Sequence, residues 1–295
     1  MRPPRWRQAG GAALLLAGLA GCTAPGWTAR QVILVRELNK PESVVVDPAT
    51  GTGYVANVVA RTEGTGSARF WAKDGTGFIA SLKPGGLLHQ YRWAESSPKA
   101  PLHSVKGMCI LDGVLYAADI DRVVRYSVGT GQAMGPIEIP GAKRLNDMAT
   151  DGQDVYVSDT ATSTIYRLRG DEVEELKAPE GVNGITFWQG KMFAVSWPHH
   201  EIYELDPNGK REPRPFGLAG HFRTLDGIEV LPDGSFVVSD FEGDRVYWVG
   251  TDRRTVAPLV KAQTPADIGL DRERMLLFVP WLMGDRVTVH VLEKR

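Results

Sequence analysis

The chain is short of the features that mark several large classes of protein. It has only two cysteines among 295 residues, so a disulfide framework is excluded and stability must come from packing. The 34 basic residues are balanced by 35 acidic ones, which leaves no basic field for nucleic acid. No P-loop, G-x-S-x-G or H-E-x-x-H pattern occurs, so these familiar routes to phosphoryl transfer, serine hydrolysis and zinc proteolysis lack candidate residues.

Long apolar runs are missing as well. The apolar stretch from Ala12 to Ala20 is too short to span a bilayer, and it follows three arginines, as in an export signal. It ends Leu-Ala-Gly-Cys at 19–22, which resembles the lipobox of bacterial lipoproteins. We therefore expect residues 1–21 to be a signal peptide and Cys22 to be lipidated; an export signal with a chance cysteine is the alternative. Thr23, which is not Asp, favours the periplasmic side of the outer membrane.

Glycine and proline are by contrast frequent, with 33 and 19 residues, as in chains with many tight turns. Six segments share one pattern: a polar residue, a short apolar strand, a turn and a second apolar strand. They are 41–57, 105–119, 145–159, 182–196, 225–240 and 266–281, and a third short strand follows each. We therefore predict an all-β fold, a six-bladed β-propeller, with a β-sandwich as the alternative.

The ends of this region predict how the propeller closes. The last repeat stops after its third strand, at Arg295, while the strand-like segment 31–38 precedes the first repeat. We expect this segment to be the outer strand of the last blade. Residues 31–295 then form the propeller domain, and residues 22–30 form a linker after the lipidated cysteine. We expect a monomer that meets the membrane through its lipid anchor alone.

The polar first positions of the repeats predict a functional centre. They are Glu42, Lys106, Asn146, Asn183, Asp226 and Asp267. Because the first strand of each blade lines the central channel, these side chains should form a ring at one mouth. Strand parity brings the ends of the second strands to the same opening, at Asn57, Asp119, Asp159, Ser196 and Asp240. The loop at about 58–76 should lie there too, while Asp147 should face a blade interface or cap a turn.

The ring has a chemical consequence. Its three carboxylates repel one another unless a positive charge lies between them, and that charge is either Lys106 or a bound cation. Carboxylate and amide oxygens are the ligands that Ca²⁺ prefers, with Mg²⁺ or Mn²⁺ as the less favoured choices. No cysteine or histidine occupies a ring position, which argues against zinc. A polar ring bridged by water, without metal, is the alternative.

The repeats also resemble the senescence-marker-protein/gluconolactonase family, whose six-bladed propellers hold a catalytic divalent metal and whose relatives include phosphotriesterase-like propellers and paraoxonases. Four motifs carry the resemblance in the family's order: Pro41-Glu42, Arg144-Leu145-Asn146-Asp147, Asn183-Gly184-Ile185 and Asp226-Gly227-Ile228. It implies that Glu42, Asn183 and Asp226 bind the metal and that Asn146 binds metal or substrate. It further implies that Arg144 contacts the substrate and that Asp226 is the catalytic base or nucleophile.

Two functions follow as hypotheses. The first is a calcium-dependent lactonase or esterase that acts on a small-molecule substrate, with the metal polarising a carbonyl at the channel mouth. Lys106 and His199 would be further substrate contacts in that case, although histidines on exposed loops are mostly inert. The second is a non-catalytic propeller that uses the same mouth, as a binding module or scaffold, for a small ligand, a glycan or a protein.

Overall fold

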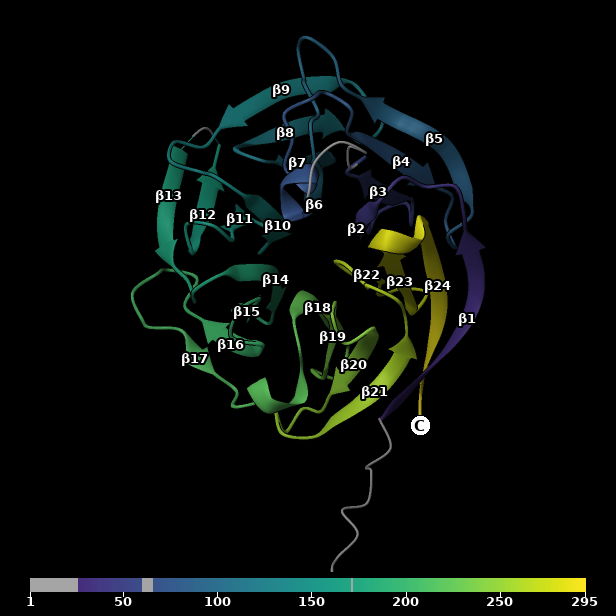
Figure 1. The fold of residues 1–295 in the computed structure, drawn as a ribbon, viewed down its shortest axis with the longest axis vertical. Helices are drawn as coiled ribbons and strands as arrows, with labels where there is room; N and C mark the ends of the chain where they lie inside the picture. Colours follow the sequence, from purple (N-terminus) through teal and green to yellow (C-terminus); the bar gives the residue numbers. More distant parts are fainter. Residues whose placement is uncertain (1–25, 60–65, 171) are drawn as a thin grey trace, which may run out of the picture.

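The structure is a computed structural model that describes residues 26–59, 66–170 and 172–295. In these ranges 24 strands form six four-stranded antiparallel sheets, arranged as blades around a central axis (Figure 1). The predicted six-bladed β-propeller is therefore confirmed. No helix in the described part of the chain has both the length and the apolar character needed to cross a membrane.

Each blade runs from an inner strand at the channel to an outer strand at the rim. The inner strands are β2 (Pro41–Val46), β6 (Val105–Leu111), β10 (Leu145–Thr150), β14 (Val182–Trp188), β18 (Leu225–Val230) and β22 (Gly269–Asp271). The second strands are β3 (Gly53–Asn57), β7 (Val114–Asp119), β11 (Val155–Asp159), β15 (Lys191–Ser196), β19 (Phe236–Asp240) and β23 (Leu276–Trp281). Both sets match the two strands predicted within each repeat.

The outer half of each blade is built in the same way. The third strands are β4 (Phe78–Leu82), β8 (Arg122–Ser127), β12 (Thr164–Arg169), β16 (Glu201–Leu205), β20 (Arg245–Val249) and β24 (Arg286–Lys294). The outer strands are β5 (Leu88–Glu95), β9 (Ala133–Glu138), β13 (Glu172–Lys177), β17 (Arg214–Pro215), β21 (Val256–Lys261) and β1 (Trp27–Val35). Short 3₁₀ turns lie at η1 (Gly66–Phe70), η2 (Ala219–His221) and η3 (Leu282–Gly284).

The N-terminal strand closes the ring, as the sequence predicts. β1 pairs antiparallel with β24, from Trp27 opposite Lys294 to Val35 opposite Val287. It begins four residues before the predicted start at Gln31, so residues 27–30 belong to the strand rather than to a linker. Blade 6 thus joins both ends of the described chain, which ties the first and last repeats together through backbone hydrogen bonds.

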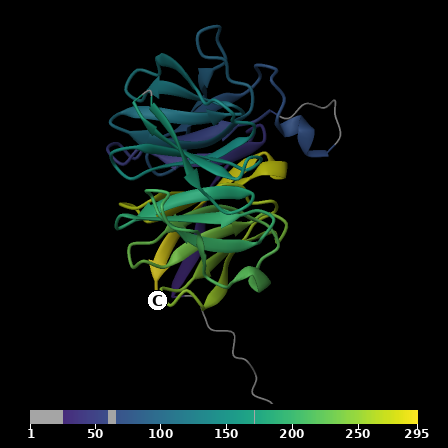
Figure 2. The ribbon, with the colours of Figure 1, turned by 90° about the vertical axis from the view of Figure 1, so that its left-hand side faces the viewer.

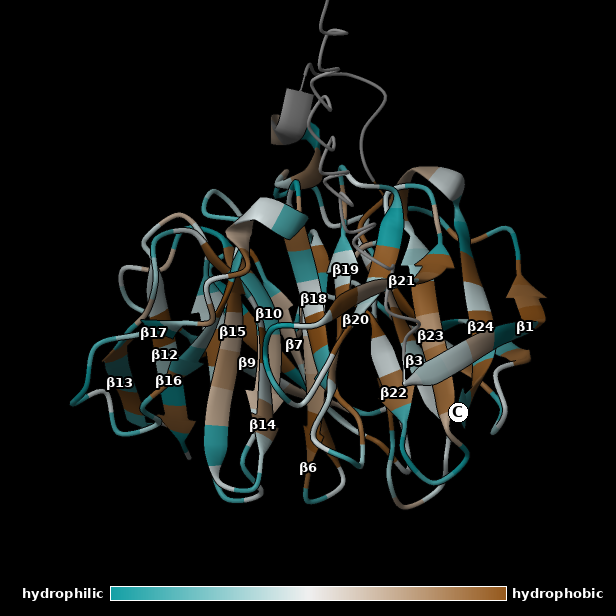
Figure 3. Cartoon of the chain, turned by 90° about the horizontal axis from the view of Figure 1, so that it is seen from below, coloured by the Kyte–Doolittle hydropathy of each residue, from teal (hydrophilic) through white to brown (hydrophobic). Residues whose placement is uncertain are grey.

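The hydrophobic core lies between the blades. One cluster joins Val44 and Phe78 of blade 1 to Phe278 and Val289 of blade 6, and the other clusters join neighbouring blades in the same way. Hydrophobic residues colour the strands, while the connecting loops are mainly hydrophilic (Figure 3). Each blade therefore buries its faces against its two neighbours, and the polar residues are left to the channel and the loops.

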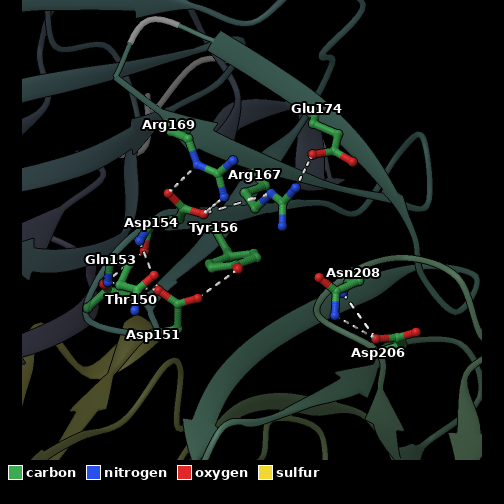
Figure 4. Close-up of polar contacts among 10 residues, drawn as sticks. All are labelled: Thr150, Asp151, Gln153, Asp154, Tyr156, Arg167, Arg169, Glu174, Asp206 and Asn208. Carbon is green, nitrogen blue, oxygen red and sulfur yellow. Dashed lines mark hydrogen bonds and ion pairs between the residues drawn. The ribbon is translucent and has the colours of Figure 1, made fainter.

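The loops at the end opposite the predicted mouth are held by local polar contacts. In blade 3, Asp151 accepts hydrogen bonds from the backbone of Gln153 and Asp154 and from the hydroxyl of Tyr156 (Figure 4). Asp154 in turn accepts two bonds from the guanidinium of Arg169. These contacts fix the turn between the first and second strands, so the polar residues of this turn have a structural role.

Candidate functional site

A β-bulge lies at the ring position of each of blades 1 to 5. In blade 3, Leu145 lies opposite Asp159 and Met148 lies opposite Val157, so two residues, 146 and 147, face one residue of β11. Blades 2, 4 and 5 have the same irregularity at 106–107, 183–184 and 226–227, and blade 1 has one at 42. A bulge turns a side chain away from the regular alternation of the strand. The polar residue that a core would reject is thereby directed to the axis.

The glycines in the Asn-Gly and Asp-Gly motifs have a purpose other than a turn. A Cβ atom on Gly184 would lie 2.4 Å from the backbone oxygen of Asp226 in the next blade. A Cβ atom on Gly227 would likewise lie 2.5 Å from Oδ1 of Asp267. Inner strands of adjacent blades therefore approach too closely for any side chain here. This brings the ring residues of blades 4, 5 and 6 near one another.

Four of the predicted ring residues make one buried cluster. Lys106 Nζ lies 3.4 Å from Glu42 Oε1, and both side chains are about 5% exposed. Asn183 Nδ2 donates a hydrogen bond of 2.8 Å to Asp226 Oδ1. The charges of Glu42 and Lys106 both act on Asp226, which places the two pairs in one electrostatic environment. We call these four residues the ring cluster.

Asn146 lies beside the ring cluster on β10. Its Nδ2 donates to Thr160 Oγ1 at 3.1 Å, and the hydroxyl of Thr160 donates to the backbone oxygen of Val182 at 2.9 Å. Because the Thr160 hydroxyl donates its single proton to the Val182 oxygen, the Thr160 oxygen must accept the hydrogen bond from Asn146 Nδ2. This chain assigns the amide and leaves Asn146 Oδ1 as an acceptor. Sequence reasoning could not identify Thr160, since nothing in its own segment is unusual.

Burial makes the ring carboxyl groups unfavourable as anions. Burial raises the pKa of Glu42, and the ammonium of Lys106 only partly opposes this effect. Burial and the charge of Glu42 raise the pKa of Asp226 well above its usual range, against the opposing effects of Lys106 and Asn183. Glu42 Oε2 is buried and has no hydrogen-bond partner in the described structure. A positive charge beside Glu42 Oε2 would therefore stabilise the ionised form of the cluster.

The charges of Glu42 and Asp226 act on Asp267, but the side-chain partner of Asp267 is Asp147 rather than a member of the ring cluster. Asp267 and Asp147 both line a cavity of about 320 Å³ that opens on the opposite side of the ring. Burial raises the pKa of Asp147 to about 7, and burial and the charge of Asp147 raise that of Asp267 well above its usual range. Two adjacent buried carboxyl groups disfavour each other's ionised form.

Asp147 also ties two blades together. Its Oδ2 accepts a hydrogen bond of 2.7 Å from the backbone nitrogen of Ile185 in blade 4, and its Oδ1 accepts from the nitrogen of Met148. The expectation that Asp147 faces a blade interface is therefore confirmed. The adjacent residues Asn146 and Asp147 thus have different roles: Asn146 lies at the mouth, and Asp147 binds the backbone of the next blade.

The acids that end the second strands do not border the opening as free groups. Asp119 accepts hydrogen bonds from the backbone nitrogens of His103 and Ser104, and Asp240 accepts from those of Arg223 and Thr224. The carboxylate of Asp159 holds residues 143 and 144 in the same way. These side chains are buried and fasten the loop that enters each inner strand. The sequence prediction placed them at the correct end of the blade but missed this structural role.

An aromatic residue from the long loop covers the ring cluster. η1 projects from one face of the disc (Figure 2), and the hydroxyl of Ser104 donates to the backbone oxygen of Phe70 at its end. Trp71 follows, with Lys106 Nζ 4.5 Å and Arg144 Cζ 5.6 Å from the centroid of its ring. The described part of the predicted mouth loop therefore lies over the mouth, while residues 60–65 lie outside the described residues.

His199 is placed apart from the ring cluster by its contacts. Its Nδ1 lies 3.1 Å from the hydroxyl of Tyr203, and its Nε2 lies 3.4 Å from Glu180 Oε2. Neither partner is a ring residue, and the His199 side chain is 45% exposed. The structure therefore does not join His199 to the other predicted substrate-binding residues, Asn146, Arg144 and Lys106.

The residues of the mouth fit a hard cation. In the described ranges no group of three His, Cys, Asp or Glu side chains is placed to hold a metal ion by itself. The candidate set is of another kind, because it combines the carboxylates of Glu42 and Asp226 with the amides of Asn146 and Asn183. Such a mixture of oxygen donors suits Ca²⁺ better than zinc or copper. Oε2 of Glu42 is buried without a hydrogen-bond partner in the described structure, whereas Oε1 lies 3.4 Å from Lys106 Nζ.

Comparison of the sequence with protein-family models and with curated proteins finds no match. Comparison of the structure finds many. Virginiamycin B lyase from Staphylococcus aureus has a TM-score of 0.63 at 11% identity, over 90% of this chain and 99% of that one. A protein provisionally assigned as a gluconolactonase has a TM-score of 0.65 at 18% identity, over 92% and 93% of the two chains. A luciferin-regenerating enzyme has 0.62 at 14% identity, over 88% and 94%.

These similarities define the class of protein. The chain is a six-bladed β-propeller that aligns with these structures over about nine-tenths of its length. Identities below 20% carry the fold and nothing further. The same fold supports a lyase in one neighbour and a different enzyme in another, so the reaction must be argued from the residues of the mouth.

Proposed function

We propose that this protein is a divalent-metal-dependent hydrolase that acts on a lactone or ester at the mouth covered by Trp71. The observation that carries the proposal is the buried, unpartnered Oε2 of Glu42 beside Asp226. A buried carboxylate oxygen without a hydrogen-bond partner is costly, and a bound ion or a catalytic role is a common reason for keeping one. The similarity of the motifs to the gluconolactonase family, and a structural neighbour assigned to that activity, agree with this function.

The metal would be held by Glu42, Asn183 and Asp226, with Asn146 Oδ1 as a fourth donor. Ca²⁺ is the proposed ion, with Mg²⁺ and Mn²⁺ as alternatives. When bound there, such an ion polarises a carbonyl oxygen and stabilises the negative charge that develops on it. Asn183 and Asn146 are oriented for this purpose, because their amide nitrogens are engaged by Asp226 and Thr160 and their oxygens remain as acceptors.

The charges of the ring cluster leave a place for a cation. Glu42 and Asp226 are two buried acids, and Lys106 is the basic side chain that contacts the cluster. A divalent ion held between the two acids would offset the negative charge that Lys106 does not.

Asp226 is the proposed base. Its Oδ1 accepts from Asn183, which leaves Oδ2 to take a proton from a water molecule that attacks the carbonyl. Its burial favours this duty, because a carboxylate in a poorly solvated site holds a proton more strongly than one in water. The ring of Trp71 lies 4.5 Å from Lys106 Nζ, and the side chains of the ring cluster are buried.

The direct test is turnover by the purified protein on a panel of lactones, aryl esters and phosphotriesters. We expect hydrolysis of at least one lactone or ester by the calcium-loaded protein, and loss of it after chelation. Restoration by added Ca²⁺ should distinguish loss of metal from denaturation. A metal-loaded, folded protein that hydrolyses no member of the panel would exclude the proposed activity.

A non-catalytic binding module is the second candidate, and one contact favours it. Lys106 already neutralises part of the charge of Glu42 without any metal, so the cluster can exist as a permanent ion pair. A propeller of this kind would present the same mouth to a small ligand, a glycan or a protein. It would bind its ligand equally well before and after chelation and would show no turnover on the panel.

The location is proposed from the sequence, because the signal peptide and Cys22 lie outside the described residues. A lipidated Cys22 would hold the propeller at the cell envelope, at the periplasmic side of the outer membrane. Since lipid chains on one cysteine provide stable anchoring, Cys22→Ser should move the protein from the membrane fraction to the soluble fraction. The melting temperature of the folded domain should not change. Equal fractionation of both forms would contradict the anchor.

A further inference from the structure

Two cationic side chains meet at one aromatic ring above the candidate metal site. Lys106 Nζ and Arg144 Cζ both lie within 6 Å of the centroid of the Trp71 indole. Lys106 comes from the ring itself, Arg144 from the loop that enters β10, and Trp71 from the segment after η1. Three separate parts of the chain therefore converge on one point of the mouth.

Lys106 has hydrogen-bond donors that its described contacts do not use. An ammonium group has three N–H donors, and the only acid it contacts in the described structure is Glu42, at 3.4 Å. The remaining contacts are to the rings of Trp71 and Phe70. Since the side chain is about 5% exposed, water cannot freely satisfy the other donors. A ligand with anionic oxygens would satisfy them.

Arg144 is in a similar position. Several arginines of this protein pair with an acid, as Arg169 does with Asp154 and Arg272 with Glu229. Within the described residues the guanidinium of Arg144 contacts only the Trp71 ring. Its backbone is fixed, because its nitrogen donates to Asp159 and its oxygen accepts from the nitrogen of Thr160. Asp159 therefore helps to position Arg144, while the guanidinium of Arg144 remains able to bind a ligand.

We propose that the substrate is an anion, a lactone or ester with a carboxylate, phosphate or sulfonate group that Lys106 and Arg144 hold beside Trp71. This inference rests on the proposed function, because it adds the substrate class to the same mouth. The anionic group lies near the reacting carbonyl, since Lys106 contacts Glu42, which is a proposed metal ligand.

Binding of two matched probes tests this without any turnover. Benzenesulfonate and benzenesulfonamide have the same framework, and only the first is charged at neutral pH. The sulfonate is also a weak ligand for Ca²⁺, so the metal itself contributes little. Calorimetric titration of the calcium-loaded protein should show the sulfonate binding at least about tenfold more tightly, the effect of one charged hydrogen bond.

Three variants locate the effect. Lys106→Met and Arg144→Gln should each weaken sulfonate binding by about tenfold and leave sulfonamide binding unchanged. The matched control is Lys143→Gln, which removes a positive charge from the same loop one residue away and should change binding by less than about twofold. Arg144 is exposed, so its variant remains informative if replacement of the buried Lys106 disturbs the fold.

The outcomes separate this inference from the function on which it rests. Equal affinity for the two probes, no binding of either, or equal loss in all three variants overturns the anion site. Hydrolysis of neutral lactones could still be observed in that case. Selective sulfonate binding that needs Lys106 and Arg144, together with no turnover on any substrate, keeps the anion site and removes the hydrolase.

Discussion

Asp226→Asn is expected to lower the turnover of a lactone or ester by at least about 10²-fold at saturating metal, which is the usual contribution of a general base. The substitution is nearly isosteric and keeps one oxygen donor. The hydrogen bond between Asp226 Oδ1 and Asn183 Nδ2 at 2.8 Å can therefore be retained by the new amide. What the variant loses is the ability to accept a proton from the attacking water.

The measurement must separate the base from the metal ligand, because Asp226 is proposed to be both. Turnover should therefore be measured over a series of calcium concentrations, and kcat compared at the plateau. A lost ligand shifts the concentration of half-saturation, whereas a lost base lowers the plateau. We expect a moderate shift and a large fall.

Glu242→Gln is the matched control for this experiment. Glu242 is an exposed acid two residues after β19, close to the mouth end of blade 5, and its replacement removes one negative charge from the same region. Its plateau turnover should stay within about twofold of the wild type, since exposed charges contribute little. A plateau for Asp226→Asn that equals that of the control would show that Asp226 is not the base.

The fold was predictable because its signal is repeated. Each blade has the same sequence of a polar residue, two short apolar strands and a turn, so an error in any one repeat is corrected by the other five. The closing strand was predictable as well, since the last repeat lacks a fourth strand and an unassigned one precedes the first. Its start at Trp27 was missed because residues 27–30 are not strongly apolar.

The ring was predictable in composition and only partly in geometry. Glu42, Lys106, Asn183 and Asp226 meet as expected, because a common position in every repeat must lead to a common position at the axis. The bulges that turn these side chains into the channel depend on pairing with the second strand, which a single segment does not reveal. Asp267 shows the limit of this reasoning, since it shares the repeat position but pairs with Asp147.

Contacts between distant segments were the least predictable feature. Trp71 lies about 35 residues before Lys106 and 73 before Arg144, and no sequence spacing relates them. The acids that end the second strands were assigned to the opening on parity alone. Their actual partners are backbone nitrogens, which carry no residue type for a pattern to detect. Contacts made by main-chain atoms could therefore be identified only from the structure.

Chelation should lower the melting temperature of the wild-type protein by roughly 5 to 10 °C. A ligand that binds only the folded state contributes about 2.7 kcal/mol at one hundred times its dissociation constant, and each kcal/mol shifts a domain of this size by about 2 to 4 °C. The physical reason lies in the ring cluster. Removal of the ion leaves Glu42 and Asp226 buried and mutually repelling, and the charge of Lys106 only partly compensates them.

The double variant Glu42→Gln/Asp226→Asn should lose this response, because both carboxylates that hold the ion become neutral amides. Its own melting temperature can be higher or lower than that of the wild type, so the quantity compared is the change on chelation within each protein. Glu242→Gln, the matched control, should respond to the chelator as the wild type does. Added Ca²⁺ should restore the wild-type value at a lower concentration than Mg²⁺, since the site offers several flexible oxygen donors rather than a tight octahedron. The same chelator response in the double variant and the wild type would place the stabilising metal elsewhere and remove the ring cluster as its site.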